Sequence, residues 1–590
     1  MQGSGTSAVV DTSSGSAPGA ASFVLVLLAI SSPWPFGSTH PQVASAITLL
    51  ALVTALGVTT AQVWRGPVAL PSCPLWPLLS LVALSALQLL PLPPSLHAVL
   101  ARGSYFLWHP PEPAVAAILS DAWRPDSIFP EATERGLGFM LGLVALSFLA
   151  APALAERRRA LRATVVVGAG GLAVALYGIA ARALYGSLLY GRIAVPTVAP
   201  FGPFVSKNHF AGYVEMVTLL ALGLATGFAD EARRGPALLG WIESRRAGRV
   251  VLTYGATATM GLAVLVSLSR GGVVSLAVGV LAFTVLRTLV RHRPPAAGRL
   301  VGILAVLAII ALGSFTVLPP EGRDRILSLA GIRADQSGAF RLGIWRDTLQ
   351  VAGSSPLVGQ GLGAYEDALP RFKTVAGELR IQHAENDYLE LLAEGGGLGL
   401  ALALIAVGLG VTRAVAGLRR QEDRLLRGLG LGATSGIIAL LVHSAFDFNL
   451  RIPSNAILFA FLAAMSMAAA CPVQLRASDL RSRAGWVLAL VTALGAAGVT
   501  AMSTSRGQVL RMTDASSTLR RERAEAELAA HLRCRPADAE AWLFLGWLRA
   551  IRGDGAEGMA LARYGAALDP LRESLQRQAA RLVVGAGLKQ

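Results

Sequence analysis

The chain has 590 residues, of which 53% are hydrophobic and only 15% are charged, and its mean hydropathy is +0.55. This composition excludes an ordinary soluble protein and is typical of polytopic membrane proteins. The formal net charge of +16 raises the alternative of nucleic-acid binding. However, the arginines fall in short clusters between apolar runs, which is the pattern of cytoplasmic loops under the positive-inside rule, so nucleic acid is not an expected partner.

The N-terminal residues 1–20 are rich in Gly, Ser and Ala and contain no Lys or Arg. They lack the basic region of a signal peptide, so we expect a disordered cytoplasmic tail. The three cysteines, Cys73, Cys471 and Cys534, show neither a CxxC motif nor metal-ligand spacing. Their spacing therefore implies neither a disulfide framework nor a zinc site.

Apolar runs of about twenty residues, the length that crosses a bilayer, recur along the chain and predict about thirteen transmembrane helices. The expected fold class is therefore all-α and polytopic. The predicted spans are 21–31 with an N-terminal extension, 43–63, 75–92, 137–154, 163–181, 210–228, 251–268, 273–290, 300–317, 391–411, 429–446, 456–470 and 486–502.

The arginine clusters fall in alternate loops, which gives the predicted orientation. The cytoplasmic clusters are 157–159, 233–234 with 245–246, 291–293, 419–427 and 476–483. The outer side then receives residues 93–135, 182–207, the turn at Ser269, residues 318–386, residues 447–453 and everything after 502.

The polar segment 318–386 is the longest stretch in the middle of the chain without a continuous apolar run. It contains Arg341 and a glycine-rich turn, and its end at His383 leads directly into the next apolar span. The sequence therefore holds a His, two Arg and several carboxylates at a membrane surface, where a lipid-linked anionic substrate would present its head group.

The tail from 514 to 590 is charged and helix-prone. Residues 541–546 followed by 562–570 resemble a tetratricopeptide (TPR) helix pair, and Pro570 fits the end of that repeat. One repeat is visible, whereas a stable solenoid usually needs about three. The tail is expected to pack on the membrane domain, on a second copy of the chain or on a protein partner.

Six motifs in order resemble the O-antigen ligase and polymerase superfamily of membrane glycosyltransferases. They begin at Ser206, Ser267, Arg341, Gly359, His383 and His443, and they cover roughly residues 201–453. The resemblance implies a glycosyltransferase C-like fold and metal-independent transfer of a glycan from a polyprenyl-diphosphate carrier, such as undecaprenyl diphosphate, without a cofactor. The implied organisation is N-terminal spans over 21–317, a periplasmic loop with the catalytic motifs over 318–386, C-terminal spans over 387–502 and a periplasmic TPR-like domain over 514–590.

Arg270 and Arg341 match the arginines that contact phosphate in this superfamily. A guanidinium suits this task because it stays charged and binds phosphate oxygens in pairs. The alternatives are an interface residue that snorkels for Arg270 and an ion pair with Asp347 or Glu366 for Arg341.

His383 is the candidate to accept the proton of the incoming hydroxyl, because an imidazole titrates near neutral pH. The resemblance gives the matching histidine the role of catalytic base or acceptor-site residue. Its neighbours Glu385, Asn386, Asp387 and Tyr388 are candidates to orient it or to bind sugar. The alternative is that His383 caps the following span.

Other polar residues lie at outer span ends. Lys207, Asn208 and His209 are equally suited to binding diphosphate or sugar and to capping and anchoring a helix, and Arg192 is a third candidate phosphate contact. For His443, Asp447 and Asn449 a structural role is slightly favoured. The outer loops contain no Asp-x-Asp pair, so a metal site is not expected.

Within the enzyme hypothesis three acceptors remain open. Lipid A core would make the protein an O-antigen ligase of lipopolysaccharide biosynthesis, another lipid-linked chain would make it a polysaccharide polymerase, and a protein side chain would make it an O-oligosaccharyltransferase. The tail hints at a protein partner and mildly favours a polymerase. The rivals are a transporter or flippase of a lipid-linked or polar substrate, and a scaffold. The predicted location is the inner membrane, with the site and the C-terminus periplasmic.

Overall fold

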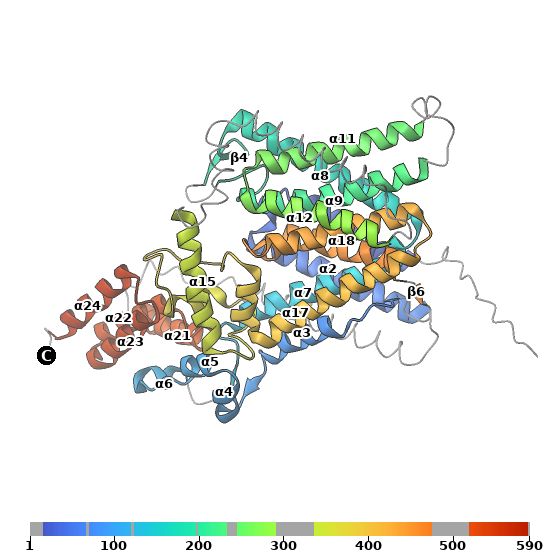
Figure 1. The fold of residues 1–590 in the computed structure, drawn as a ribbon. Helices are drawn as coiled ribbons and strands as arrows, with labels where there is room; N and C mark the ends of the chain where they lie inside the picture. Colours follow the sequence, from blue (N-terminus) through green and yellow to red (C-terminus); the bar gives the residue numbers. More distant parts are fainter. Residues whose placement is uncertain are drawn as a thin grey trace, which may run out of the picture.

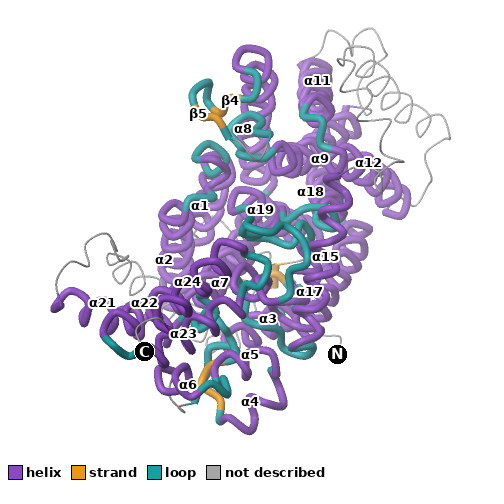
Figure 2. Tube along the Cα trace, turned by 90° about the vertical axis from the view of Figure 1, so that its left-hand side faces the viewer, coloured by secondary structure: helices purple, strands orange, loops and turns teal. Residues whose placement is uncertain are grey.

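The computed structural model describes residues 16–65, 70–119, 123–195, 199–232, 245–290, 336–471, 473–474 and 518–587. Helices dominate this part of the chain, and its strands form three two-residue antiparallel pairs (Figures 1 and 2). The prediction of an all-α polytopic membrane protein is confirmed.

Nine helices of the described residues are long and apolar enough to cross a membrane. They are α2 (Pro41–Arg65), α7 (Pro130–Leu154), α8 (Arg157–Tyr185), α9 (Lys207–Ala232), α11 (Arg245–Val266), α12 (Arg270–Val290), α17 (Asp387–Arg420), α18 (Arg424–His443) and α19 (Pro453–Ala470). Two shorter apolar helices, α1 (Ser16–Ser31) and α3 (Trp76–Leu87), bring the total to eleven of the thirteen predicted spans. The other two, 300–317 and 486–502, lie outside the described residues.

Helix α1 begins at Ser16, as the N-terminal extension predicted for the span 21–31 implies, and it thereby includes the end of the segment assigned to a tail. Helix α3 has 12 residues and is therefore only about 18 Å long, shorter than a hydrocarbon core.

Short elements and the tail gather beyond one end of the bundle, at the left of Figure 1. They include α4 (Pro94–Leu100), α5 (Arg102–Trp108), α6 (Pro113–Leu119), α15 (Gln336–Ser354), α16 (Tyr365–Ala368), α21 (Thr518–Cys534), α22 (Ala539–Arg552), α23 (Gly555–Leu568) and α24 (Glu573–Gly587). The 3-10 helices are η2 (Phe36–Ser38), η4 (Leu369–Arg371) and η5 (Asn449–Arg451). The strand pairs are β1 (Leu70–Pro71) with β6 (Val473–Gln474), β2 (Pro91–Leu92) with β3 (Arg124–Pro125), and β4 (Leu188–Leu189) with β5 (Ile193–Ala194).

The arginine clusters that the structure describes meet at the opposite end of the bundle. Arg157 at the start of α8 pairs with Glu231 on α9 at 2.6 Å and with Asp423 before α18 at 2.8 Å. Arg287 on α12 pairs with Asp230 on α9 at 2.9 Å. These contacts agree with the predicted alternation of loops, while the side of the membrane that this end faces stays a prediction.

Cys73 and Cys471 form a disulfide at this end, which the cysteine spacing did not indicate. Their Cα atoms are 6.5 Å apart although 398 residues separate them in sequence. The adjacent strands β1 and β6 pair with Leu70 opposite Gln474, which aligns the two segments. Cys534 is a free thiol. Spacing rules for disulfides apply to small secreted domains, so they miss a link between distant spans.

Helices α9 and α18 pack closely at the centre of the bundle because glycines face each other. A Cβ atom added to Gly428 on α18 would lie 2.5 Å from the carbonyl oxygen of Gly223 on α9. A Cβ added to Gly432 would lie 2.5 Å from the carbonyl oxygen of Leu219. Small residues at such spacing let helix backbones approach closely in membranes. The polar residues His209, Glu215 and His443 lie on this pair of helices.

We expect Gly428→Ala to destabilise the protein by about 1–3 kcal/mol, because a methyl group would force α9 and α18 apart. The matched control is Gly408→Ala on α17, where an added Cβ meets no atom within 4 Å. Thermal unfolding in nanodiscs measures the effect. Equal midpoints for the two variants would contradict close packing of the two backbones.

Candidate active site

Asn386 and Tyr388 fix the start of α17. The side-chain oxygen of Asn386 accepts hydrogen bonds from the backbone N–H of Tyr388 at 3.0 Å and of Leu389 at 3.1 Å, so Asn386 is the N-cap. The amide of Asn386 donates to the carbonyl of Ala445 at 2.9 Å, and the Tyr388 hydroxyl donates to that of Leu441 at 2.7 Å. The cap is therefore Asn386, not His383, and both residues tie α17 to α18.

His383 is held by Glu390, one turn inside α17. Its Nδ1 lies 3.0 Å from Oε1 of Glu390, and Oε2 of Glu390 accepts from the backbone N–H of Ala384 at 2.8 Å. Because an ionised carboxylate only accepts, Nδ1 carries the proton in this contact, and Nε2 is the nitrogen left to act as a base. The sequence suggested Glu385, Asn386 or Asp387 as the orienting residue, but the structure gives this contact to Glu390.

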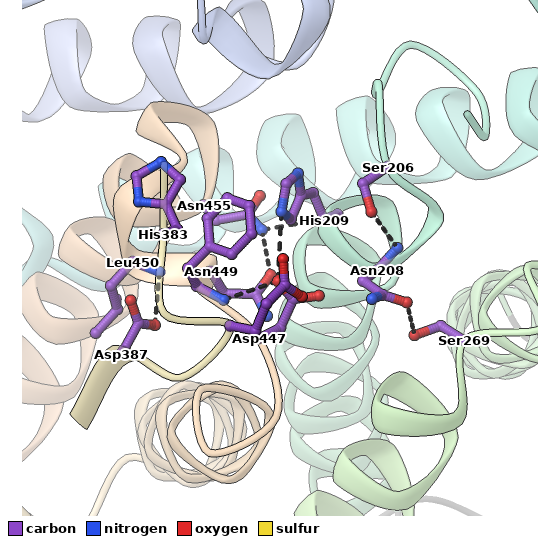
Figure 3. A network of polar contacts seen from close by, with 12 residues as sticks. Ser206, Asn208, His209, Ser269, His383, Asp387, Asp447, Asn449, Leu450 and Asn455 are labelled. Carbon is purple, nitrogen blue, oxygen red and sulfur yellow. Dashed lines mark hydrogen bonds and ion pairs between the residues drawn. The ribbon is translucent and has the colours of Figure 1, made fainter. Parts of the chain in front are cut away.

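Arg451 of η5 joins two buried carboxylates of α17. Its Nε lies 3.2 Å from Oε1 of Glu390, and its Nη2 donates to Oε2 of Glu394. Asp387 lies beside this group and accepts from the backbone N–H of Leu450 at 3.0 Å (Figure 3). One guanidinium therefore bridges two acids that are almost completely buried.

The glycine-rich turn positions Glu394. Gly359, Gly361 and Gly363 all have positive φ, which favours glycine. The N–H of Gln360 donates to the carbonyl of Ala393 at 3.0 Å, and that of Gly361 donates to the carbonyl of Glu394 at 3.0 Å. These carbonyls precede Gly396, where α17 departs from helical geometry with φ +64°. The turn thus satisfies backbone groups that the break in the helix releases.

A second polar group includes His209 and Asp447 (Figure 3) and lies on the other side of Phe448 from His383. His209 Nε2 is 3.5 Å from Oδ1 of Asp447, and His443 Nδ1 is 3.2 Å from Oε1 of Glu215. The ring of Phe448 stacks on His383 with centroids 4.2 Å apart and meets His209 edge-on at 4.8 Å. Phe448 therefore separates the two histidines.

The two predicted phosphate-binding arginines border this second group. Arg341 of α15 pairs with Glu385, with Nη2 and Oε2 3.1 Å apart, and not with Asp347 or Glu366. Arg270 is the first residue of α12. Its neighbour Gly271 lies against His443, because a Cβ added there would be 2.9 Å from Nε2 of that histidine.

Ser269 connects the Arg270 turn to α9. Its hydroxyl donates to the side-chain oxygen of Asn208 at 2.9 Å and accepts from the N–H of Gly272 at 3.2 Å. Asn208 follows Lys207, the first residue of α9, and precedes His209. Apart from Arg192, the predicted residues therefore come together at one end of the bundle.

Arg192 lies apart from this assembly. It is exposed at the turn of the β4–β5 hairpin. The neighbouring Tyr190 meets the ring of Phe36 with centroids 5.6 Å apart, and its hydroxyl donates to the carbonyl of Trp34. The contacts of this hairpin thus run to the segment after α1, and a role for Arg192 stays a prediction.

The charges set the protonation of the groups outside the spans. Burial acts to lower the pKa of His383, but the charge of Glu390 and the hydrogen bond to it raise the pKa above its usual 6.5. Burial and the charge of Asp447 raise the pKa of Glu385 against the effect of Arg341. Burial alone would raise the pKa of Asp447, but the hydrogen bond to His209 and the nearby positive charges lower it.

A cavity of about 750 Å³ opens beside His383. His383, Asp387 and Arg451 line its polar end, and Cys73 and Cys471 line the other. Apolar side chains of α2, α3, α7, α17, α18 and α19 form most of the wall. The cavity follows α19 over its full 18 residues, which corresponds to about 27 Å and approaches the thickness of a hydrocarbon core.

Four charged residues of the site escaped the sequence analysis: Glu215, Glu390, Glu394 and Arg451. A signal was present, because Asp387, Glu390 and Glu394 follow each other at helical spacing at the start of an apolar span. Ionisable residues in such spans are rare and usually functional. Within the described residues no group of three or more His, Cys, Asp or Glu side chains is arranged to hold a metal ion.

We expect Arg451→Ala to destabilise the protein by about 3–5 kcal/mol, because Glu390 and Glu394 would stay buried without their cation. Arg413→Ala, at an exposed position of α17, is the matched control. The thermal unfolding midpoint in nanodiscs measures the difference. An Arg451→Ala midpoint equal to that of the control would show that the buried acids do not need this partner.

Comparison with known proteins adds one finding. Residues 255–404 match the family model described as O-Antigen ligase, and a search of curated proteins gave no match for the chain. The matched segment contains Arg270, Arg341 and His383 together with the carboxylates of Glu390 and Glu394. Over this segment the chain is similar to the O-antigen ligase family, and its apolar helices make it a multi-pass membrane protein.

Proposed function

We propose that the protein transfers a glycan from a polyprenyl-diphosphate carrier to an acceptor hydroxyl at the outer face of the inner membrane. The family match supports glycosyl transfer of the ligase or polymerase type in general. The observation that carries the finer proposal is the apolar cavity that ends at His383 and Arg451. A carrier lipid in this cavity would bring its diphosphate to the polar end.

The cavity suits a polyprenyl chain because its wall is mostly apolar and it follows a whole membrane-spanning helix. Burial of an apolar chain there gains about 25 cal/mol per Å² of surface removed from water. The diphosphate cannot follow the chain into this wall, because an unpaired charge in an apolar environment is costly. The head group would therefore stay at the polar end of the cavity, where His383 and Arg451 lie.

Arg270 and Arg341 would hold the diphosphate. Arg270 begins α12, so the positive end of that helix dipole adds to its charge. Arg341 pairs with Glu385, and phosphate oxygens would replace that carboxylate when the donor binds. The two guanidiniums would then balance the charge that develops on the leaving diphosphate.

His383 would take the proton of the acceptor. The acceptor oxygen forms a bond to the anomeric carbon while the bond from that carbon to the diphosphate oxygen breaks, and the hydroxyl proton passes to Nε2. Glu390 holds Nδ1–H and so favours the tautomer with a lone pair on Nε2. Glu390 also stabilises the imidazolium that forms.

We expect purified wild-type protein to release polyprenyl diphosphate from a lipid-linked glycan, and Arg270→Ala, Arg341→Ala and His383→Ala each to reduce kcat by about 100-fold or more. Arg413→Ala is the control, because it is exposed on the membrane part of α17. Transfer is followed by chromatography of the lipid and glycan products.

The acceptor is then varied in the same assay. Chain growth without an added acceptor would indicate a polymerase, transfer only to lipid A core a ligase, and transfer to protein an oligosaccharyltransferase. Movement of the intact lipid across a vesicle membrane without release of diphosphate would refute the enzyme proposal and favour a flippase.

The pH dependence of kcat provides a separate test. A base with a raised pKa loses activity as the pH falls through that pKa, so the acidic limb of wild type should lie above pH 6.5. Glu390→Gln removes the charge that raises the pKa of His383, so the limb should move to lower pH. The exposed Glu422→Gln is the control and should leave the limb in place. An unchanged limb in Glu390→Gln would exclude His383 as the titrating base.

A further inference from the structure

The C-terminal helices α21–α24 pack against the outer loops of the membrane domain (Figure 1). Leu528, Leu532 and Trp542 of the tail share one buried cluster with Val115 of α6 and Tyr365 of α16. Trp542 and Leu532 are completely buried. The sequence allowed three arrangements for the tail: packing on the membrane domain, on a second copy of the chain or on a partner. In the described residues, the tail packs on its own membrane domain.

Two ion pairs with buried carboxylates set the orientation of this contact. Arg535 donates to Oδ1 of Asp367 through Nη2 at 2.6 Å and through Nε at 3.0 Å. Lys373 Nζ lies 2.9 Å from Oδ1 of Asp569, and their side chains are 3% and 9% exposed. A buried charge is tolerated only opposite its partner, so these pairs favour one register of the tail on the loop.

The segment held by the tail leads directly to His383. Asp367 also meets Nη2 of Arg380 at 3.4 Å, and Nε of Arg380 lies 2.5 Å from Glu366. Arg380 is three residues before His383. Through Asp367, the tail is therefore connected to a residue three positions before the candidate base.

A second connection runs through the carboxylates. Tyr365, two residues before Asp367, donates its backbone N–H to Oε1 of Glu394 at 3.4 Å. Glu394 binds Arg451, and Arg451 contacts Glu390, the partner of His383. The segment 365–383 is thus bounded by the tail on one side and by the buried charge cluster on the other.

We propose that the C-terminal domain positions the active site, with Arg535 as a positioning residue that holds the segment 365–383, and hence His383, through Asp367. The expected effect on turnover rests on the proposed function. The expected effect on the order of residues 365–383 does not, and hydrogen exchange measures it separately. Recruitment of a protein partner by the tail is the competing role.

The test compares Arg535→Ala, the single variant Asp367→Arg and the charge exchange Asp367→Arg/Arg535→Asp. Arg523→Ala is the matched control, because Arg523 lies on the same helix α21 with its side chain 74% exposed. Hydrogen exchange of residues 365–383 reports the order of the segment. Steady-state kinetics with a lipid-linked glycan separates kcat from KM, and exchange within α22 and α23 checks that the tail stays folded.

We expect Arg535→Ala to speed exchange over 365–383 and to lower kcat by about 10- to 100-fold with little change in the KM of the donor, because small displacements of a catalytic group cost about this much. The charge exchange should restore both quantities, which a general loss of folding would not allow. Arg523→Ala should match wild type.

The inference would be overturned if Arg535→Ala and Asp367→Arg both showed the same hydrogen exchange over 365–383 and the same kcat as Arg523→Ala. This outcome would leave the proposed function intact, because wild type would still transfer glycan. Loss of activity without faster exchange over 365–383, or with loss of protection throughout α22 and α23, would also overturn the inference. If wild type transfers no glycan but Arg535→Ala still loosens 365–383 and the charge exchange restores it, the proposed function fails while the positioning contact stands.

Discussion

The pairing of buried carboxylates with one guanidinium is the constraint on which the site depends. Glu390 and Glu394 are each 1% exposed, and Arg451 contacts both. The desolvation of such acids is several kcal/mol per ion and must be offset by a partner of good geometry. The loop that carries Arg451 therefore has to stay at the start of α17. His383 gains its orientation from the same carboxylate that needs the arginine.

The break in α17 is compatible with a membrane because other parts of the chain take over its backbone hydrogen bonds. Gly396 leaves helical geometry, and the N–H of Gly397 donates to the carbonyl of Pro356 at 2.8 Å. The carbonyl of Pro356, before the glycine turn, thus accepts a hydrogen bond from the residue after the break. The N–H groups of Gln360 and Gly361, in the turn itself, donate to carbonyls before the break. A side chain at Gly359 or Gly396 would overlap the facing backbone. The glycine motif is therefore a packing requirement of the broken helix as much as a feature of the site.

Sequence reasoning recovered the helical class, the nine described helices that are long enough to cross a membrane and two shorter apolar helices, because hydropathy and helix length are local properties. It also collected most of the polar residues, since motifs at span ends mark one membrane surface. It did not identify which side chains pair with each other. His383 has three acids closer in sequence than Glu390, yet only the helical path of α17 decides which one faces Nδ1. The Cys73–Cys471 link and the contact of Arg535 with Asp367 join residues hundreds of positions or several spans apart, and neither has a local signal.

The close packing of α9 and α18 and the polarity of the site depend on each other. Glu215 lies inside an apolar helix and His443 at the end of another, and both are completely buried. Their atoms can meet at 3.2 Å only because the facing glycines remove the side chains that would hold the helices apart. Larger residues at these glycines would separate the two helices and weaken the contact between the Glu215 carboxylate and His443, which would leave a buried charge poorly paired. The glycine spacing therefore serves the packing of the two helices and also allows Glu215 and His443 to meet.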